Sequence, residues 1–107
     1  MTRAEIHPGI CVQICQVEVE CQEDGQHARV KVETTCEHIR GLIESQGPVV
    51  DSWEVCLKTP GTGPFFEYAS AHFPPDACCP VLPGIIKCIR AECGLALKAD
   101  TYLHFIE

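Results

Sequence analysis

Apolar and polar residues alternate over two neighbouring stretches near the start of the chain, and this pattern predicts a β-hairpin. The first stretch, residues 11–22, alternates cleanly from Cys15 onward, with thiol and valine side chains on one face and Gln or Glu on the other. The second stretch is residues 27–34, with its apolar positions on the inward face. Between them, Asp24-Gly25 is typical of a two-residue hairpin turn.

This turn fixes the register of the hairpin. It places Glu18 opposite Lys31 and Glu20 opposite Arg29 on the exposed face, so that opposite charges meet. On the buried face it pairs valines with valines, Val17 with Val32 and Val19 with Val30. Because a slip of one residue would turn every side chain to the wrong face, these agreements support one register.

Apolar residues recur at helical spacing in the stretch that follows the hairpin. Residues 35–45 are predicted to form a helix with its apolar side toward the core. Thr34 and Glu37 have the spacing of a capping box at its start. Gly47-Pro48 is a typical end for such a helix.

Residues 49–59 fit two structures. Val50, Trp53 and Leu57 have helical spacing, and Asp51 is well placed to cap a helix that starts there. Alternating apolar residues in the same stretch also fit a short strand. We favour the helix.

Residues 76–94 are the most distinctive stretch of the chain. An apolar helix is predicted between Pro83, which suits a first helical turn, and Gly94, which suits the position just after a helix ends. Two adjacent cysteines, Cys78 and Cys79, come just before it. The positive end of the helix dipole is expected to favour their thiolate forms.

The remaining segments complete a fold. Residues 1–9 read as a loose lead-in, residues 64–72 as a helix opened by Pro64, and residues 101–106 as a final strand. The predicted fold class is α+β, a small antiparallel sheet (N-terminal hairpin plus C-terminal strand) with three or four helices packed on one face. Residues 1–107 are predicted to be one domain, and the pattern does not decide which hairpin edge the last strand joins.

Composition narrows the class of protein. The chain has 107 residues, of which 46% are hydrophobic, and a formal net charge of −7, which argues against nucleic-acid and anionic-membrane surfaces. It has no apolar run long enough for a membrane span and no signal-peptide pattern at its start. Nine cysteines are an odd number for a disulfide framework, so we expect a reducing cytoplasm.

Four thiols are candidates for a shared metal site. Cys36 opens the first predicted helix, Cys78 and Cys79 precede the last one, and Cys15 lies at the end of the hairpin ladder. If both helix starts lie at the same end of the sheet, the four thiols converge, and they can hold zinc or an iron–sulfur cluster. No C-x2-C motif supports this site, and the alternative is that these cysteines fill core space.

Three further residues can support chemistry at these thiols. His38 and His72 are close in sequence to the candidate cysteines and can act as a base for a cysteine nucleophile, although lone histidines are usually surface or capping residues. Lys87 lies one turn above the thiols and can lower a pKa or bind an anion, although a solvated face explains it equally. The remaining cysteines are expected to be packing residues: Cys11, Cys21, Cys56, Cys88 and Cys93.

Part of the chain resembles a family of small uncharacterised prokaryotic domains. The similarity lies in the C-P-V-x-P-x-I-I-K segment from Cys79 to Lys87 and the G-L-A-L run that begins at Gly94, with Cys36 in a second anchor. The resemblance implies no activity. It does imply a cytoplasmic, prokaryotic setting and importance for Cys36, Cys79 and Lys87.

Three functions therefore remain open. The first is a small cytoplasmic protein that binds a metal ion or an iron–sulfur cluster through thiolates near helix starts. The second is a structural or interaction domain with mostly buried cysteines, and the third is a thiol-redox protein. Whether the protein is an enzyme stays undecided. A homodimer or a protein partner is also open, because an exposed edge strand can pair two chains.

Overall fold

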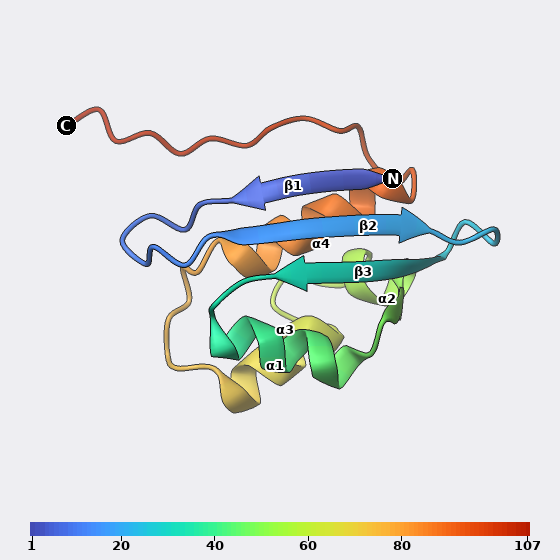
Figure 1. The fold of residues 1–107 in the computed structure, drawn as a ribbon, viewed down its shortest axis with the longest axis horizontal. Helices are drawn as coiled ribbons and strands as arrows, with labels where there is room; N and C mark the ends of the chain where they lie inside the picture. Colours follow the sequence, from blue (N-terminus) through green and yellow to red (C-terminus); the bar gives the residue numbers. More distant parts are fainter.

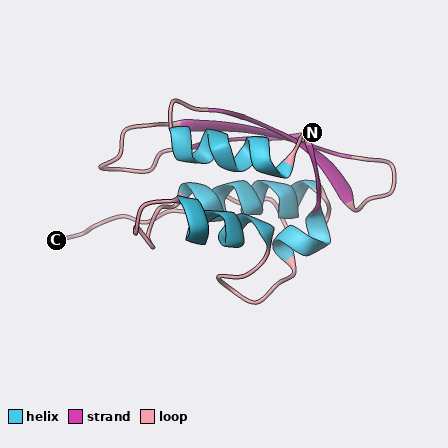
Figure 2. Cartoon of the chain, turned by 90° about the horizontal axis from the view of Figure 1, so that it is seen from below, coloured by secondary structure: helices cyan, strands magenta, loops and turns pink.

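The computed structural model describes residues 1–107 as one antiparallel sheet covered by helices on one face (Figures 1 and 2). The strands lie in the order β1-β2-β3-β4. They are β1 (Thr2–Ile6), β2 (Cys15–Cys21), β3 (His27–Glu33) and β4 (Val49–Asp51). The helices are α1 (Glu37–Gln46), α2 (Ser52–Cys56), α3 (Pro64–His72) and α4 (Val81–Glu92). The predicted α+β class is confirmed.

The hairpin of β2 and β3 has the predicted register. Glu18 lies opposite Lys31 and Glu20 opposite Arg29 on the exposed face, and Glu18 also forms an ion pair with Arg3 of β1 at 3.1 Å. On the inner face, Val17 pairs with Val32 and Val19 with Val30. Local alternation and cross-strand charge were therefore sufficient to define this part of the sheet.

The two ends of the chain have the opposite roles to those predicted. The expected lead-in contains β1, which pairs antiparallel with β2 from Thr2, opposite Val19, to Ile6, opposite Cys15. The expected strand at residues 101–106 is extended but joins no strand, and every residue from 97 to 107 is exposed. That prediction is wrong, and both edges of the hairpin are occupied by other strands, β2 by β1 and β3 by β4.

Close approach between β1 and α4 explains why β1 occupies the edge of the sheet beside β2. Ile6 points at Gly84 of α4, and a Cβ atom on Gly84 would lie 2.7 Å from Ile6 Cδ1. The missing side chain lets the strand and the helix touch, and larger residues there would force Ile6 to move. Ile6 and Ala4 are both packed against the core.

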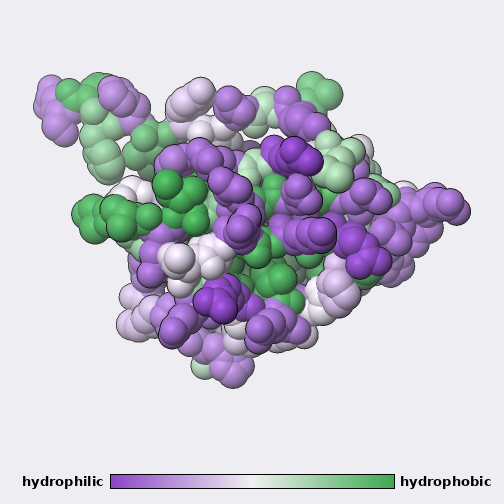
Figure 3. All heavy atoms as spheres, in the orientation of Figure 1, coloured by the Kyte–Doolittle hydropathy of each residue, from purple (hydrophilic) through white to green (hydrophobic).

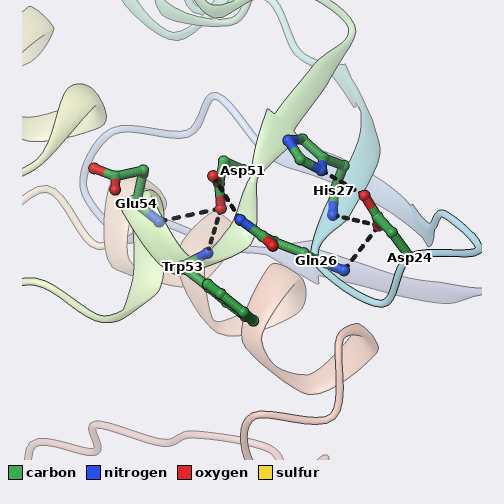
Figure 4. A network of polar contacts seen from close by, with 6 residues as sticks. All are labelled: Asp24, Gln26, His27, Asp51, Trp53 and Glu54. Atoms are coloured by element: carbon green, nitrogen blue, oxygen red, sulfur yellow. Dashed lines mark hydrogen bonds and ion pairs between the residues drawn. The ribbon is translucent and has the colours of Figure 1, made fainter.

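The ambiguous stretch 49–59 contains both predicted structures. It begins with the three-residue strand β4 and continues directly into the short helix α2. Asp51 caps this helix, because its Oδ1 accepts hydrogen bonds from the backbone N–H groups of Trp53 (3.0 Å) and Glu54 (3.5 Å) (Figure 4). The helix that we favoured is thus shorter than expected and starts after a strand.

A second aspartate organises the hairpin turn. Asp24 Oδ1 accepts hydrogen bonds from the backbone N–H groups of Gln26 and His27, both at 2.9 Å, and its Oδ2 contacts His27 Nδ1 at 2.6 Å (Figure 4). The backbone bonds from His27 and Gln26 lower the pKa of Asp24 to about 2. Gln26 then links the turn to α2, since its Nε2 donates to Asp51 Oδ2 at 2.9 Å.

Two helix starts differ from the prediction. Cys36, not a threonine, is the N-cap of α1, and no side chain caps that helix. Thr34 Oγ1 instead accepts a hydrogen bond from the Cys36 N–H at 3.2 Å, so the proposed capping box is absent. Helix α4 starts at Val81, two residues before Pro83, because a proline is tolerated anywhere in a first turn.

Helix α4 forms the centre of the core. Its residues Ile85 and Ile89 are 0% exposed and belong to one apolar cluster with Val17 and Val19 of β2 and Phe65 of α3. The helix runs in the same direction as β2 beneath the sheet (Figure 1). None of the helices has the length and apolar composition needed to cross a bilayer.

Glu92, at the end of α4, links this helix to β1 and β2 by hydrogen bonds. Its Oε2 accepts a hydrogen bond from the Cys21 N–H at 3.0 Å, and its Oε1 accepts one from Thr2 Oγ1 at 2.8 Å. The Met1 ammonium group lies 3.5 Å from the same Oε1. The bond from Cys21, followed by those from Thr2 and Met1, lowers the pKa of Glu92 despite some burial.

Replacing Glu92 by glutamine should destabilise the protein by about 1 kcal/mol at pH 7, because charge-assisted hydrogen bonds at a partly solvated site are worth little more. A carboxyl whose pKa is lowered on folding stabilises the fold above its usual value of 4.5, and this effect is lost as the pH falls through the folded value. Urea unfolding should therefore show a wild-type advantage at pH 7 that shrinks below pH 4.5. Glu44→Gln, at an exposed position of α1, is the control and should change little at either pH. An advantage that persists undiminished in acid would contradict the role of the charge.

Candidate functional site

Two of the four predicted metal-site cysteines, Cys36 and Cys79, lie within electrostatic reach of a third, Cys15. Cys15 is the first residue of β2 and is 0% exposed, Cys36 is the N-cap of α1, and Cys79 precedes the α4 N-cap by one residue. We call these three the α4-start thiols. They come from three separate parts of the sequence: the start of β2, the start of α1 and the approach to α4.

The electrostatics of Cys15 show this proximity. Burial is the main cause that raises the pKa of the Cys15 thiol to about 11, and negative charge on Cys36, Cys79 and Cys88 raises it further. The Thr34 hydroxyl acts in the opposite direction by a side-chain hydrogen bond. Burial therefore favours the protonated form of the Cys15 thiol, and three other thiols are near enough for their charge to act on it.

Cys78 does not join this group in the structure. Its side chain is exposed, and its thiol donates a hydrogen bond to Asp76 Oδ1 at 3.2 Å, while its backbone N–H lies 3.3 Å from the same oxygen. The hydrogen bond to Asp76, and then the charge of that carboxylate, raise the pKa of Cys78. The expectation that the helix dipole favours a thiolate at Cys78 is thus wrong, because the carboxylate two residues earlier outweighs it.

The three proposed supporting residues are exposed and make no polar contact with any thiol. The His38 ring lies against Phe73, with centroids 5.7 Å apart, and the His72 ring lies 4.3 Å from that of Tyr68. Lys87 is on the solvent side of α4. Aromatic contact explains both histidines, and no base is placed beside a candidate nucleophile.

The α4-start thiols are not arranged as a metal centre. No group of three or more His, Cys, Asp or Glu side chains has positions suited to hold a metal ion. A tetrahedral zinc site with Zn–S distances near 2.3 Å requires sulfur atoms roughly 3.8 Å apart. The sulfur atoms would therefore have to move closer together before they could share an ion.

A second group of thiols lies at the opposite end of α4. Burial, followed by the Cys21 thiol as a hydrogen-bond partner, raises the pKa of Cys93 to about 12, with a smaller contribution from Cys56. Cys56 is a partly buried thiol that donates to the Ile86 carbonyl at 3.6 Å, and burial raises its pKa to about 11. We call Cys21, Cys56 and Cys93 the α4-end thiols.

Ser52 adds a polar side chain to the α4-end thiols. Its Oγ is 0% exposed and has no hydrogen-bond partner of standard geometry, although the hydroxyl is close enough to Cys93 to lower the pKa of that thiol. The sequence does contain a hint of this group. Strand β2 and helix α4 each have a cysteine at or near both ends. Because the two elements run in the same direction, the cysteines at their starts lie at one end of the fold and those at their ends lie at the other.

The cysteines predicted to be packing residues behave differently from one another. Cys88 is buried in the core, and Cys56 and Cys93 pack against it, as predicted. Cys21 is only partly buried. Cys11 is exposed in the connection between β1 and β2, so the prediction is wrong there.

A surface hollow of about 940 Å³ has no cysteine in its lining. It is lined by residues of β1, β2 and β3 and by the end of α1, and it includes Lys31, Glu33, Ile43 and Glu44. Apolar atoms surrounded by polar ones are visible on this face of the molecule (Figure 3). Side chains of both charges line it, so its electrostatics single out no class of ligand.

Comparison with known proteins gives one match. A family model described as "Family of unknown function (DUF6951)" matches residues 2–105. No curated protein and no solved structure matches the chain. The predicted resemblance to an uncharacterised family is confirmed, while the prokaryotic and cytoplasmic setting stays a prediction.

Proposed function

Because the chain belongs to that family of unknown function, which brings no activity with it, we propose from the chain's own geometry that the protein binds a thiophilic metal ion at the α4-start thiols. One observation supports the proposal: Cys36 and Cys79, from distant parts of the sequence, both lie near enough to the buried Cys15 thiol for their charge to act on it. Soft thiolate ligands select zinc, copper(I) and iron–sulfur clusters over harder metals. The odd number of cysteines makes a reducing cytoplasm the fitting compartment.

Metal binding at this site requires proton loss and some movement. Because burial keeps the pKa of Cys15 near 11, this thiol must give up its proton to the solvent as the ion takes its place. Cys36 and Cys79 are partly buried, each next to the start of a helix, where backbone N–H groups favour negative charge. Cys78 is the natural fourth ligand, since turning it away from Asp76 breaks only one exposed hydrogen bond of its thiol.

A second candidate function is reversible thiol–disulfide exchange between Cys36 and Cys79. The position of both cysteines near Cys15 supports it, because a disulfide needs only two of these sulfur atoms to meet. The oxidant would be a low-molecular-weight disulfide. One thiolate attacks it to form a mixed disulfide and releases one thiol, and the other protein thiolate then displaces the second thiol. Both electrons pass to the small disulfide, which leaves as two thiols.

Zinc titration of protein purified without air or chelators tests the first function. We expect one equivalent of zinc per chain, measured by elemental analysis and by competition with a chromophoric chelator. Cys36→Ser and Cys79→Ser should each weaken binding by about 100-fold or more, because even residues that only support metal ligands contribute 10- to 100-fold. Cys11→Ser removes an exposed thiol outside the site and should bind like wild type. Less than a few tenths of an equivalent in wild type, or equal binding by all variants, would exclude the proposed site.

Mass spectrometry distinguishes thiol–disulfide exchange from a structural or interaction domain. Incubation with oxidised glutathione followed by removal of small molecules should lower the mass by two hydrogens if Cys36 and Cys79 form a disulfide. Either serine variant should abolish that change. If wild type neither binds zinc nor changes in mass, and most thiols resist alkylation in the native state, the cysteines are structural and the protein is an interaction or structural domain.

A further inference from the structure

The segment that follows α4 pairs with no strand of the sheet in its own chain. Residues 96–107 donate and accept no hydrogen bonds within the chain, and the last bond before them joins the Leu95 N–H to the Arg90 carbonyl. The segment runs above β1 as an extended chain, and its outer end projects past the sheet and carries hydrophobic residues (Figures 1 and 3). We call residues 96–107 the tail.

The tail exposes more apolar surface than a solvated segment normally does. Its large hydrophobic side chains are between 81% and 94% exposed; they are Leu97, Tyr102, Leu103, Phe105 and Ile106. Residues 101–106 also have the composition of a strand, rich in aromatic and β-branched residues. The family match extends to residue 105 and therefore includes residues 101–105 of the tail. Such a segment is expected to be covered by a partner.

The sheet offers an open edge of matching length. Strand β1 pairs only with β2, so its outer edge has unpaired backbone groups. Its five residues, Thr2–Ile6, extend over about 17 Å, and the six residues 101–106 extend over about 20 Å. An added strand there would satisfy the backbone groups of both segments.

The direction of the tail explains why β1 of the same chain does not bind it. Glu92 is hydrogen-bonded to Thr2, so the tail begins beside the start of β1. From there it runs in the same direction as β1 (Figure 1). Pairing within the chain would therefore be parallel, in a sheet that is otherwise antiparallel. In a second copy related by a two-fold axis perpendicular to the strands, β1 runs the opposite way, and pairing becomes antiparallel.

We propose that two copies of this chain form a symmetric dimer in which residues 101–106 of each pair with β1 of the other. Each sheet then has five strands, and both tails are covered by one isologous interface. The tail suits this contact because Asp100 and Glu107 flank a stretch without acidic or basic residues other than His104. This dimer involves neither thiol group, so it stands independently of the metal proposal.

Light scattering coupled to size exclusion tests the dimer at concentrations from about 1 to 100 μM. Wild type should have twice the mass of the chain at high concentration. The double variant Leu103→Glu with Phe105→Glu should have the mass of one chain, at least tenfold weaker association, and an unchanged circular dichroism spectrum, because both side chains are more than 80% exposed in their own chain. Leu57→Glu changes an apolar residue that is 59% exposed elsewhere on the surface and should leave the dimer intact.

Hydrogen exchange identifies the surfaces that associate. Amides of residues 101–106 and of β1 should exchange slowly at 100 μM and faster on dilution, and in the double variant residues 101–106 should exchange at the rate of an unstructured peptide. A wild-type protein that is monomeric at 100 μM would overturn the proposal, whatever else the tail binds. So would a dimer that survives the double substitution or leaves the amides of residues 101–106 unprotected.

Discussion

Replacing Ile89 by alanine is expected to lower the free energy of unfolding by about 2–5 kcal/mol, the usual range for removing a fully buried isoleucine side chain. Ile89 is 0% exposed and lies in the apolar cluster that joins α4 to the inner face of the sheet. The loss includes the transfer free energy of the removed methyl and methylene groups and the cavity that they leave. Because domains of this size are stable by only about 5–15 kcal/mol, the variant should be visibly less stable.

Lys87→Ala is the matched control for this effect. It lies on the same helix, is exposed and makes no ion pair, and alanine is at least as good a helix former. Urea unfolding followed by circular dichroism should show a lower midpoint for Ile89→Ala and an almost unchanged one for Lys87→Ala. Equal midpoints for Ile89→Ala and wild type would mean that α4 is not packed as described.

Gly63→Ala should give the second large loss, about 1–3 kcal/mol from backbone strain alone. Gly63 has φ +95° and ψ 172°, a conformation almost restricted to glycine, at the N-cap of α3. The position is buried, and an added Cβ would lie 3.1 Å from the carbonyl oxygen of Glu54. A backbone atom cannot move aside as easily as a side chain, so the steric contact adds to the strain.

Gly61 provides a control in the same loop. It also has a positive φ, +81°, but an added Cβ would have no atom within 4 Å. Gly61→Ala should therefore cost only the left-handed backbone penalty, about 1–2 kcal/mol. Thermal unfolding of both variants should give the lower midpoint for Gly63→Ala, and the reverse order would show that contact with Glu54 is unimportant.

The parts of the fold that could be predicted are those set by local sequence. Cross-strand charges and valine pairs define the β2–β3 register because the turn is only a few residues long. The Asp51 cap and the Pro64 start of α3 are likewise local. Positions that depend on distant partners were missed. Strand β1 contains weak strand formers, Ala4 and Glu5 among them. It forms because it pairs with β2 and because Gly84 leaves room for its Ile6 side chain.

The site was predictable in outline but not in orientation. The nearness of Cys36 and Cys79 to Cys15 fits helices α1 and α4 that start at the same end of the sheet, a condition that the sequence could state but not decide. The direction of Cys78 depends on one hydrogen bond to Asp76, and a pattern of residue types does not specify which of two adjacent thiols turns outward. The α4-end thiols were missed because the direction of α4 relative to β2 is a property of tertiary packing.

The contact between Thr2 and Glu92 has a consequence for folding of the chain during its synthesis on the ribosome. The two residues are 90 positions apart in the chain, and Glu92 also holds the end of β2 through Cys21. The hairpin can form as soon as it leaves the exit tunnel. Strand β1, in contrast, lacks its hydrogen-bond partner Glu92 until α4 has been synthesised. Nascent chains stalled before residue 92 should thus keep their earliest residues accessible to proteases and chaperones, and release of the finished chain should close them into the sheet.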